Sequence, residues 1–267
     1  MKRSVNLTLG ITLVAILATL MLLSLFYTPY EPNAMRIAAR LQAPGPAHLL
    51  GTDNFGRDVL SRVMVGAQTA FLVGTASVAV GAAGGLIVGT IAGYAGKWVD
   101  ELLMRATDAL LAFPGILLAL LLVSVFKPNL YQTILAIGIL FMPSFARVVR
   151  SGVLQHREAE YVRAVQGFGA GPFNILFVQI LPNIASSIIT TAALSFSTAI
   201  LIEAALSYLG LGVQPPNPSW GRMLNESQTY LAKAPWFTLA PGALITITVL
   251  GFNLLSDGIR DARDRRG

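Results

Sequence analysis

The sequence predicts an all-α protein that crosses a membrane six times, and three observations support this fold class. Only 12% of the 267 residues are charged, 54% are apolar, and the mean hydropathy is +0.66. A soluble domain carries roughly a quarter charged residues, so this composition does not suit a water-exposed surface. The apolar residues also gather in tracts long enough to cross a bilayer as helices. We therefore expect residues 1–267 to form a single transmembrane domain.

The composition also excludes several kinds of site. The chain has no cysteine, which excludes disulfides, thiolate–metal sites and cysteine nucleophiles. Its two histidines, His48 and His156, lie in separate polar segments, where we expect solvated loop residues and not metal ligands. The net charge of +6 does not indicate nucleic-acid binding, because the basic residues lie at the ends of apolar tracts. We expect no catalytic residue, cofactor, metal or nucleic acid on this chain, and membrane lipid around it.

The first predicted span covers residues 9–26. Lys2 and Arg3 precede it, as in a secretory signal peptide, but no Ala-x-Ala cleavage site follows. The tract also has about the length that a bilayer requires. We therefore interpret it as a transmembrane helix that starts in the cytoplasm.

An outer segment, residues 27–69, follows the first span and contains the sequence HLLGTDNFGRDVLSR. We expect Asp53 to cap a short helix there, because aspartate accepts hydrogen bonds from free amides at a helix start. Asp58 and Arg62 are four residues apart, which favours an ion pair on that helix. A capped surface helix leading into the membrane accounts for these residues without any chemistry.

The second predicted span, residues 71–94, carries a glycine at every fourth position: Gly81, Gly85, Gly89 and Gly93. This spacing places the glycines on one helical face, and in lipid such a face lets two helix backbones approach closely. We expect the helix to pack against another helix of this subunit or of a partner. The connection 96–108 places Glu101 and Arg105 one turn apart, which indicates a surface helix and a second, smaller docking element.

The remaining predicted spans cover residues 109–126, 130–149, 184–203 and 237–255. Pro114 and Pro143 lie inside two of them and predict kinks, which neighbouring helices make tolerable. A second outer segment, residues 204–236, precedes the last span.

The fifth span is rich in hydroxyl groups at helical spacing. Its candidate pathway residues are Ser187, Thr191, Ser195, Thr198 and, near the outer end, Glu203. They either line a polar pathway or hydrogen-bond to other helices, and the sequence leaves both alternatives open.

Basic residues predict which side of the membrane each segment faces. With both termini, the 96–108 connection and the region 150–183 placed in the cytoplasm, that side has twelve Lys and Arg residues and the opposite side has seven. The cytoplasmic residues are Lys2, Arg3, Lys97, Arg105, Arg147, Arg150, Arg157, Arg163, Arg260, Arg263, Arg265 and Arg266, and the outer ones are Arg36, Arg40, Arg57, Arg62, Lys127, Arg222 and Lys233. Cytoplasmic loops usually carry the excess, so both termini are expected inside the cell.

The polar region 150–183, between the fourth and fifth spans, is the main candidate functional site. It begins with a charged, helix-compatible run, turns at Gly169 to Gly171, restarts at Pro172 and is expected to stop at Leu181-Pro182. We interpret it as two short exposed helices that dock onto another protein.

This region resembles the EAA-type coupling loop of ABC importer permease subunits, whose pattern is E-A-A-x3-G-x9-I-x-L-P. Four residues match the pattern: Ala164, Gly169, Leu181 and Pro182. Arg163 stands at the Glu position, Val165 at the second Ala and Gln179 at the Ile. The salt bridge that the glutamate would make is therefore not carried over, and an Arg163 facing an ATPase would need an acidic partner there.

Two further segments, HLLGTDNFGRDVLSR and EAALSYLGLGVQPPNPSWG, resemble the C-type subunit of the dipeptide, oligopeptide and nickel permease group, as does the end FNLLSDGIRDARD. The resemblance spans residues 48 to 265 and implies the permease fold of type I ABC importers. It also implies a B-type permease paralogue, two ATPase subunits that bind ATP and magnesium, an extracytoplasmic solute-binding protein, and the inner membrane of a prokaryote. The expected ATPase-docking residues are Glu160, Tyr161, Arg163, Ala164, Gly169, Gly171, Phe173, Leu181 and Pro182.

The resemblance leaves the transported solute open. Dipeptides or oligopeptides are expected, with nickel chelates, haem or another peptide-like solute as alternatives for the same machinery. A membrane enzyme or self-sufficient channel is a more distant alternative, because no predicted span contains Asp, His or Lys. A purely structural membrane scaffold is a third, and it would assemble without any ATPase.

Overall fold

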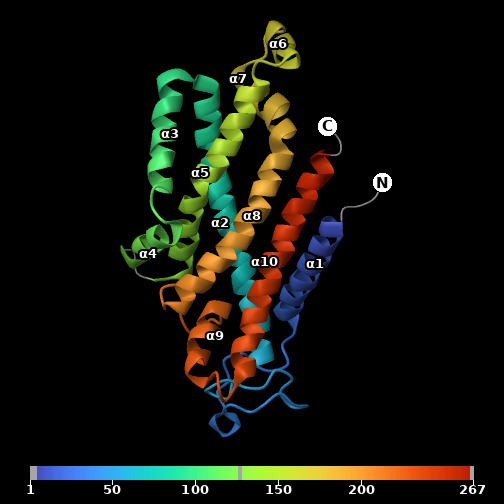
Figure 1. The fold of residues 1–267 in the computed structure, drawn as a ribbon, viewed down its shortest axis with the longest axis vertical. Helices are drawn as coiled ribbons and strands as arrows, with labels where there is room; N and C mark the ends of the chain where they lie inside the picture. The colour runs from blue at the N-terminus through green and yellow to red at the C-terminus, as the bar shows by residue number, and fades with distance from the viewer. Residues whose placement is uncertain (1–4, 126–127, 265–267) are drawn as a thin grey trace.

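The computed structural model describes residues 5–125 and 128–264, and nearly all of its regular structure is helical (Figure 1). The long helices are α1 (Val5–Phe26), α2 (Val59–Ala95), α3 (Lys97–Leu111), α4 (Gly115–Val125), α5 (Leu130–His156), α8 (Leu181–Tyr208) and α10 (Pro235–Asp264). The short ones are η1 (Ile37–Ala39), α6 (Glu160–Gly167), α7 (Pro172–Asn174), the π-helical segment η2 (Ile175–Ile180), α9 (Trp220–Ser227) and η3 (Gln228–Tyr230). The expectation of an all-α polytopic membrane protein is confirmed.

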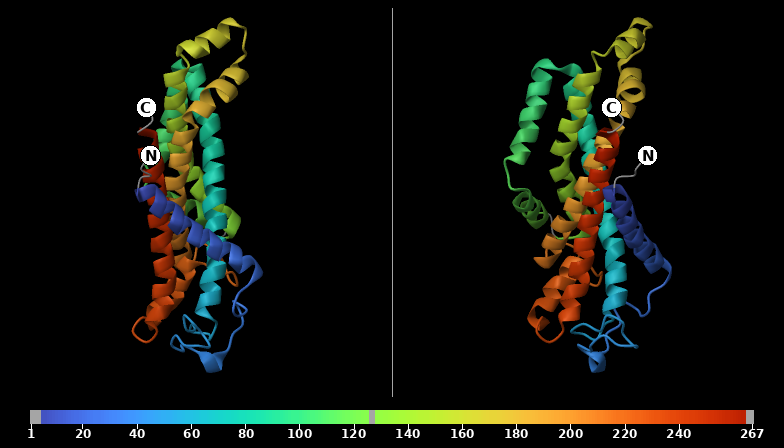
Figure 2. Two further views of the ribbon diagram at one scale, coloured as in Figure 1. Left: turned by 90° about the vertical axis from the view of Figure 1, so that its right-hand side faces the viewer. Right: turned by 45° about the vertical axis from the view of Figure 1, so that its right-hand side comes forward.

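The helices form an elongated bundle with α6 and α7 at one end and α9 with the outer segment at the other (Figure 1). Figure 2 shows α1 inclined across the bundle, and it packs mainly against α10. Among the described residues, five helical stretches are long and apolar enough to cross a membrane, and a bent pair brings the number to six.

The bent pair corrects the expected third span, residues 109–126. In place of one helix, α3 begins at Lys97 and α4 ends at Val125, with a bend of 88° between them. Pro114 lies at this break, because proline clashes with the preceding turn and has no amide to donate. The 96–108 connection is helical as expected, with the exposed pair Glu101–Arg105, but it is the first part of α3 and continues into the residues expected as a span. Pro143, by contrast, lies inside α5 without interrupting it.

Side-chain caps explain where several helices begin. Asp58 accepts a hydrogen bond from the Ser61 amide at 2.8 Å, so α2 begins at Val59, well before the expected span. Asn129 and Ser219 cap α5 and α9 in the same way. Asp53 is not the cap of a helix, which corrects that expectation. Polar residues at the helix ends continue the helices beyond the apolar tracts from which the spans were predicted.

The most extensive contact in the bundle joins α2 to α5 along the glycine face. A Cβ atom added at Gly85 would lie 2.3 Å from Cβ of Phe145, and one at Gly89 would lie 2.5 Å from the Ala146 carbonyl oxygen. Gly138 of α5 makes the reciprocal approach to Val80 of α2. The structure thus identifies the partner of the glycine face as a helix of the same subunit.

Three buried apolar clusters fill the bundle. One lies among α2, α8, α9 and α10 near the α9 end, and a second lies among α2, α4, α5 and α8. The third, which we call the coupling core, lies directly beneath α6. It consists of Val149, Val153, Val162, Ile175, Ile180 and Ile184.

Candidate functional site

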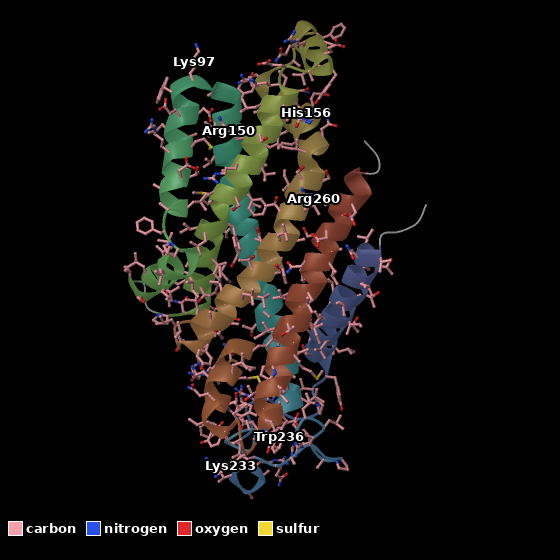
Figure 3. All side chains as sticks on the ribbon, in the orientation of Figure 1. Lys97, Arg150, His156, Lys233, Trp236 and Arg260 are labelled. Carbon is pink, nitrogen blue, oxygen red and sulfur yellow. The ribbon has the colours of Figure 1, made fainter. Side chains whose placement is uncertain are left out.

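The predicted coupling region 150–183 lies at the end of the bundle that carries α6, with Arg150 and His156 near it and Lys233 and Trp236 at the opposite end (Figure 3). Its first seven residues continue helix α5 and do not form a loop, which corrects the expected start of the region. Arg150 forms a two-pronged ion pair with Asp100 of α3, with 2.5 Å between Nη2 and Oδ2. The start of the region is therefore held against α3.

A second contact ties the region to α2. Arg157 follows α5 and donates from Nη1 to the Gly93 carbonyl oxygen at 3.0 Å, close to the carboxyl end of α2. A guanidinium group at this position complements the partial negative charge of the helix end and satisfies a terminal carbonyl. The linker between α5 and α6 is thus anchored at its base.

Helix α6 presents most of its residues outward. Val162 is its one buried residue and inserts into the coupling core. Glu160 lies in the first turn, where a carboxylate complements the helix dipole. Gly169 ends the helix with φ of +84°, and no atom lies within 4 Å of a Cβ added there. The left-handed backbone, and not a lack of space, is therefore the reason for glycine at this position.

The turn after α6 is a Schellman motif. The Gly169 amide donates to the Gln166 carbonyl at 2.9 Å and the Ala170 amide to the Val165 carbonyl at 3.2 Å. Pro172 then occupies the first turn of α7, as expected, because its missing amide would have no partner there.

The expected stop at Leu181-Pro182 is wrong. From Pro172 to Tyr208 the chain is one helical stretch, with the six-residue π-helical segment η2 between α7 and α8. The Asn183 side-chain amide donates to the Gln179 carbonyl at 2.6 Å beside Pro182. A π-helical turn and a side-chain donor together accommodate a proline that would otherwise break the helix.

The structure places the expected docking residues at one end of the molecule. Those exposed are Glu160, Tyr161, Arg163, Ala164, Gly169, Gly171, Phe173 and Pro182, whereas Leu181 is half-buried against the coupling core. Arg163 makes no ion pair with any other side chain within residues 5–125 and 128–261. Its guanidinium group is therefore available to an acidic partner.

Two aromatic residues beside these were not predicted. Phe168 is 92% exposed, although it lies in the middle of the turn, and Phe177 stacks on Phe173 with 4.4 Å between ring centroids. Phe173 and Phe177 are four residues apart on one helical stretch, a spacing that could have indicated the pair. An exposed aromatic surface of this kind is typical of a protein contact.

The candidate pathway residues of α8 do not share one environment. Thr198 is exposed and Ser187 and Thr191 are half-buried, but Ser195 and Glu203 are buried inside the subunit. Thr191 and Thr198 donate to carbonyls four residues earlier in their own helix, at 2.9 and 3.0 Å. Hydroxyls bonded in this way need no polar cavity. Pathway lining by these five residues therefore stays a prediction.

A groove between α5 and α8 contains one of the five, Ser187. Arg147, Ser151 and Gln155 line it from α5, and Arg147 also pairs with Asp108 of α3 at 2.6 Å. The groove thus places polar side chains of α5 and α8 next to the coupling region.

Glu203 joins α8 to the second outer segment. Its Oε1 accepts a hydrogen bond from the Ser207 hydroxyl at 2.6 Å, and the Ser219 hydroxyl is also hydrogen-bonded to it. Ser207 Oγ in turn accepts from the Val213 amide. The carboxyl group thus holds the loop before α9 on α8, a contact that the sequence did not indicate.

Replacing Glu203 by leucine is expected to lower the free energy of unfolding by about 1–3 kcal/mol, because two buried hydroxyls lose their acceptor. The measurement is thermal unfolding of the purified subunit in detergent. Thr198→Val on the same helix is the control and should change the stability by no more than about 0.5 kcal/mol, because its exposed hydroxyl bonds only to its own helix. Equal stability of the two variants would contradict a structural role for Glu203.

Charged residues of the outer segment and of α9 form a buried to half-buried group that we call the outer charge cluster: Asp53, Arg57, Arg62, Arg222 and Glu226. Arg57 bonds to Asp53 at 2.5 Å and to Glu226 at 2.7 Å, and Arg62 lies 3.4 Å from Glu226. The expected Asp58–Arg62 pair is therefore wrong, because the carboxylate of Asp58 caps α2 and Arg62 reaches α9. The cluster binds the outer segment to α9.

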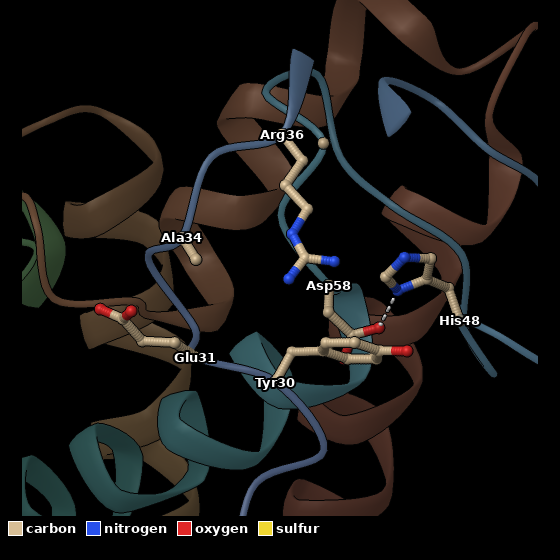
Figure 4. Close-up of a pocket in the computed structure, with 7 residues that line it drawn as sticks. Tyr30, Glu31, Ala34, Arg36, His48 and Asp58 are labelled. Carbon is tan, nitrogen blue, oxygen red and sulfur yellow. Dashed lines mark hydrogen bonds and ion pairs between the residues drawn. The ribbon is translucent and has the colours of Figure 1, made fainter. Parts of the chain in front are cut away.

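The outer segment also contains a small cavity, which His48, Asp58 and Tyr30 help to line (Figure 4). His48 Nδ1 is 2.9 Å from Asp58 Oδ1, and the Tyr30 ring lies over the imidazole with 4.6 Å between centroids. His48 is buried and paired, so the expected solvated loop histidine is wrong at this position. No group of three His, Cys, Asp or Glu residues that could hold a metal exists within 5–125 and 128–264.

Known proteins similar to this chain include permease subunits. It is 45% identical over 252 residues to the dipeptide transport system permease protein DppC of Alkalihalophilus pseudofirmus, which covers 94% of this chain and 81% of that protein. It is 42% identical to the di/tripeptide permease protein DppC of Pseudomonas aeruginosa, over 88% of this chain and 80% of that one. The glutathione transport system permease protein GsiD of Pectobacterium atrosepticum is 40% identical, over 90% and 80% of the two chains.

A solved structure supports the fold. The methionine ABC transporter MetNI in inward-facing conformations matches with a TM-score of 0.56 and 13% identity, over 75% of this chain and 95% of the matched chain. At this identity the similarity concerns the fold alone. The family described as the binding-protein-dependent transport system inner membrane component matches residues 85–266, which include the coupling region. This chain is therefore a multi-pass membrane permease, not an enzyme, and belongs to the family of inner membrane components of binding-protein-dependent ABC transport systems.

Proposed function

We propose that this chain is the C-type permease subunit of an ATP-driven importer for dipeptides or short oligopeptides, and that it forms half of the translocation pathway. The observation that carries the proposal is the junction beneath α6. Val162 of α6 is buried with Val153 of α5 and with Ile184 of α8 in one apolar core. A partner that moves α6 therefore moves both helices that flank the region.

The close approach of α5 to α8 supports this mechanical role. A Cβ atom added at Gly152 would lie 2.5 Å from Cγ2 of Ile184, which belongs to the coupling core. Densely packed elements shift as rigid bodies. From the coupling core α8 runs toward α9 (Figure 1), so a displacement at one end of α8 is carried toward the other.

In this proposal, partner subunits supply the other functions of the transport complex. ATP and magnesium are bound by two cytoplasmic ATPase subunits, a B-type permease paralogue completes the pathway, and an extracytoplasmic binding protein delivers the solute. Both termini of this chain then lie in the cytoplasm with α6. The exposed aromatic residues Phe168, Phe173 and Phe177 are the surface that enters the ATPase. Closure of the ATPase dimer selects between inward- and outward-open states.

The names of the similar proteins support a peptide as the solute, since two of those quoted above transport dipeptides or tripeptides and one transports glutathione, itself a peptide. The test is uptake of labelled dialanine into liposomes that contain the complete complex, its binding protein and internal ATP. Glutathione, a nickel chelate and haem, added in excess as competitors, distinguish the alternative solutes. Uptake by this chain alone, without ATPases, would contradict the proposal.

Gly169→Val is expected to lower solute uptake per ATP hydrolysed by about five- to thirtyfold, because a left-handed backbone costs a β-branched residue roughly 1–2 kcal/mol. The turn then places α6 and α7 at a different angle in the ATPase. Gly167→Val is the matched control, because the space around Gly167 is equally open but its backbone is helical. Both quantities are measured on the complex in liposomes. Unchanged uptake per ATP in Gly169→Val would contradict the docking role.

A further inference from the structure

Three polar side chains from three helices meet beside α6. The Tyr161 hydroxyl of α6 lies 3.0 Å from Nδ1 of His156 at the end of α5. The Asn183 side-chain amide of α8 donates to the Tyr161 oxygen at 3.4 Å and to the Gln179 carbonyl at 2.6 Å. When the proton of a neutral His156 is on Nε2, all three groups form one directed chain from Asn183 through Tyr161 to Nδ1.

We call this series of hydrogen bonds the polar latch. It concerns the orientation of α6, which the coupling core alone does not fix. Helix α6 has eight residues, and among them Val162 alone is buried. A single buried contact holds one point of a short helix but lets the helix rotate about that point. Tyr161 provides a second point of attachment, on the neighbouring residue and to two other helices. Two points fix the direction of α6.

The latch also reaches the unusual part of α8. Asn183 spans from the Tyr161 hydroxyl to the Gln179 carbonyl of η2, where the helix has π-helical turns. Such π-helical turns are one of the places where long helices kink. The latch therefore adds a polar connection between α6 and α8 to the apolar one that Val162 makes with Ile180 and Ile184.

We propose that the polar latch sets the angle of α6 relative to α5 and α8, and that Tyr161, His156 and Asn183 are positioning residues for the transmission of ATPase movement. This inference rests on the proposed function, since it assigns the transmission step to three side chains. The Tyr161 hydroxyl then acts by hydrogen-bonding to residues of its own subunit, and not by contacting the ATPase.

The variants are Tyr161→Phe, Asn183→Ala and the double variant, each in the complete complex. Tyr161→Phe keeps the ring and the apolar packing and removes only the hydroxyl. Tyr208→Phe is the matched control, because Tyr208 is 38% exposed like Tyr161 and its hydroxyl makes a comparable bond, 3.0 Å from Oε1 of Gln228, at the other end of α8.

The direct readout is the distance between spin labels on cysteines introduced at Gln166 of α6 and Ile189 of α8, both exposed. The natural sequence has no cysteine, so these two labels are unique in this chain. The second readout is dialanine uptake per ATP hydrolysed. The distance between the labels does not depend on the solute. If the wild-type complex does not take up dialanine, the peptide assignment is refuted, but the test of the latch by distance remains valid.

Tyr161→Phe and Asn183→Ala are each expected to raise the population of a second α6 position about two- to tenfold and to lower uptake per ATP by a similar factor. The double variant should lose no more uptake per ATP than the more affected single variant, because both substitutions break the same series of hydrogen bonds. Tyr208→Phe should match the wild type. Wild-type distances in Tyr161→Phe would overturn the proposal. Loss of ATPase binding by that variant would also overturn it, because the hydroxyl would then be a docking contact.

Discussion

Gly85→Leu should yield no folded subunit, because the contact between α2 and α5 leaves no room for a side chain. A Cβ atom at this position would lie 2.3 Å from Cβ of Phe145 and 2.8 Å from the Met142 carbonyl oxygen. Neither is the flexible end of a side chain, so one of the two helices must shift. The α2–α5 contact is the most extensive in the bundle, and its loss exposes both helices. The measurement is the yield of monodisperse protein after membrane extraction.

A graded version of this test separates packing from helix propensity. Gly85→Ala is expected to lower the free energy of unfolding by about 1–3 kcal/mol, a typical effect of overpacking. Gly84→Ala, one residue earlier on the same helix, is the control, because its nearest neighbour is the movable sulfur of Met142 at 3.0 Å. Both variants gain the same helix propensity from alanine. A Gly85→Ala variant as stable as Gly84→Ala would show that the helices are not closely packed there.

The second large effect concerns the outer charge cluster. Glu226→Ala is expected to lower the free energy of unfolding by about 3–5 kcal/mol, because removal of one partner leaves buried charge uncompensated. Arg57 and Arg62 are 8% and 1% exposed at their side chains, and both reach Glu226. Asp53 alone would then have to balance two guanidinium groups. Thermal unfolding in detergent measures the stability, and protease cleavage within residues 27–58 reports release of the outer segment.

Glu101→Ala provides the control for this experiment. Glu101 pairs with Arg105 at 2.6 Å, but the two side chains are 63% and 76% exposed. An exposed pair at this spacing contributes about 0.3–0.5 kcal/mol, since water already solvates both charges. Similar stabilities of Glu226→Ala and Glu101→Ala would refute the structural role of the cluster.

The outer charge cluster and the coupling core explain how one subunit can be rigid at both ends and still transmit movement. The outer charge cluster joins the outer segment to α9, and Glu203 joins α9 to α8 through Ser219. At the opposite end, the coupling core joins α6 to α5 and α8. Helix α8 contacts both the coupling core and α9. In the proposed mechanism it therefore transmits a displacement of α6 to the opposite end of the subunit.

The glycine repeat illustrates how far the sequence leads. A spacing of four residues was sufficient to predict a close helix contact in lipid, because the period of the helix puts those positions on one face. It could not identify α5 as the partner, since any helix with a complementary surface would satisfy the same pattern. The match depends on Gly138, Phe145 and Ala146, which come more than forty residues later.

In the coupling region, too, some features were predictable from the sequence and others were not. Pro172 at a helix start and the turn at Gly169 were predictable, because each depends on the backbone preferences of a single residue. The stop at Leu181-Pro182 was predicted because the next apolar tract begins there, and it was wrong, because η2 and the Asn183 amide accommodate the proline within one helical stretch. Phe168 as an exposed aromatic residue had no distinct signal in an apolar sequence.

By itself the sequence determined the polytopic helical fold, the glycine contact and the position of the coupling turn, because apolar length, helical period and local backbone preference are properties of neighbouring residues. Only the tertiary structure decided how charged and polar groups are paired. Asp58 caps α2 instead of binding Arg62, Arg62 reaches Glu226 on α9, and Tyr161 joins His156 to Asn183. A buried polar group must find a partner wherever the folded chain supplies one, and that partner can lie anywhere in the sequence.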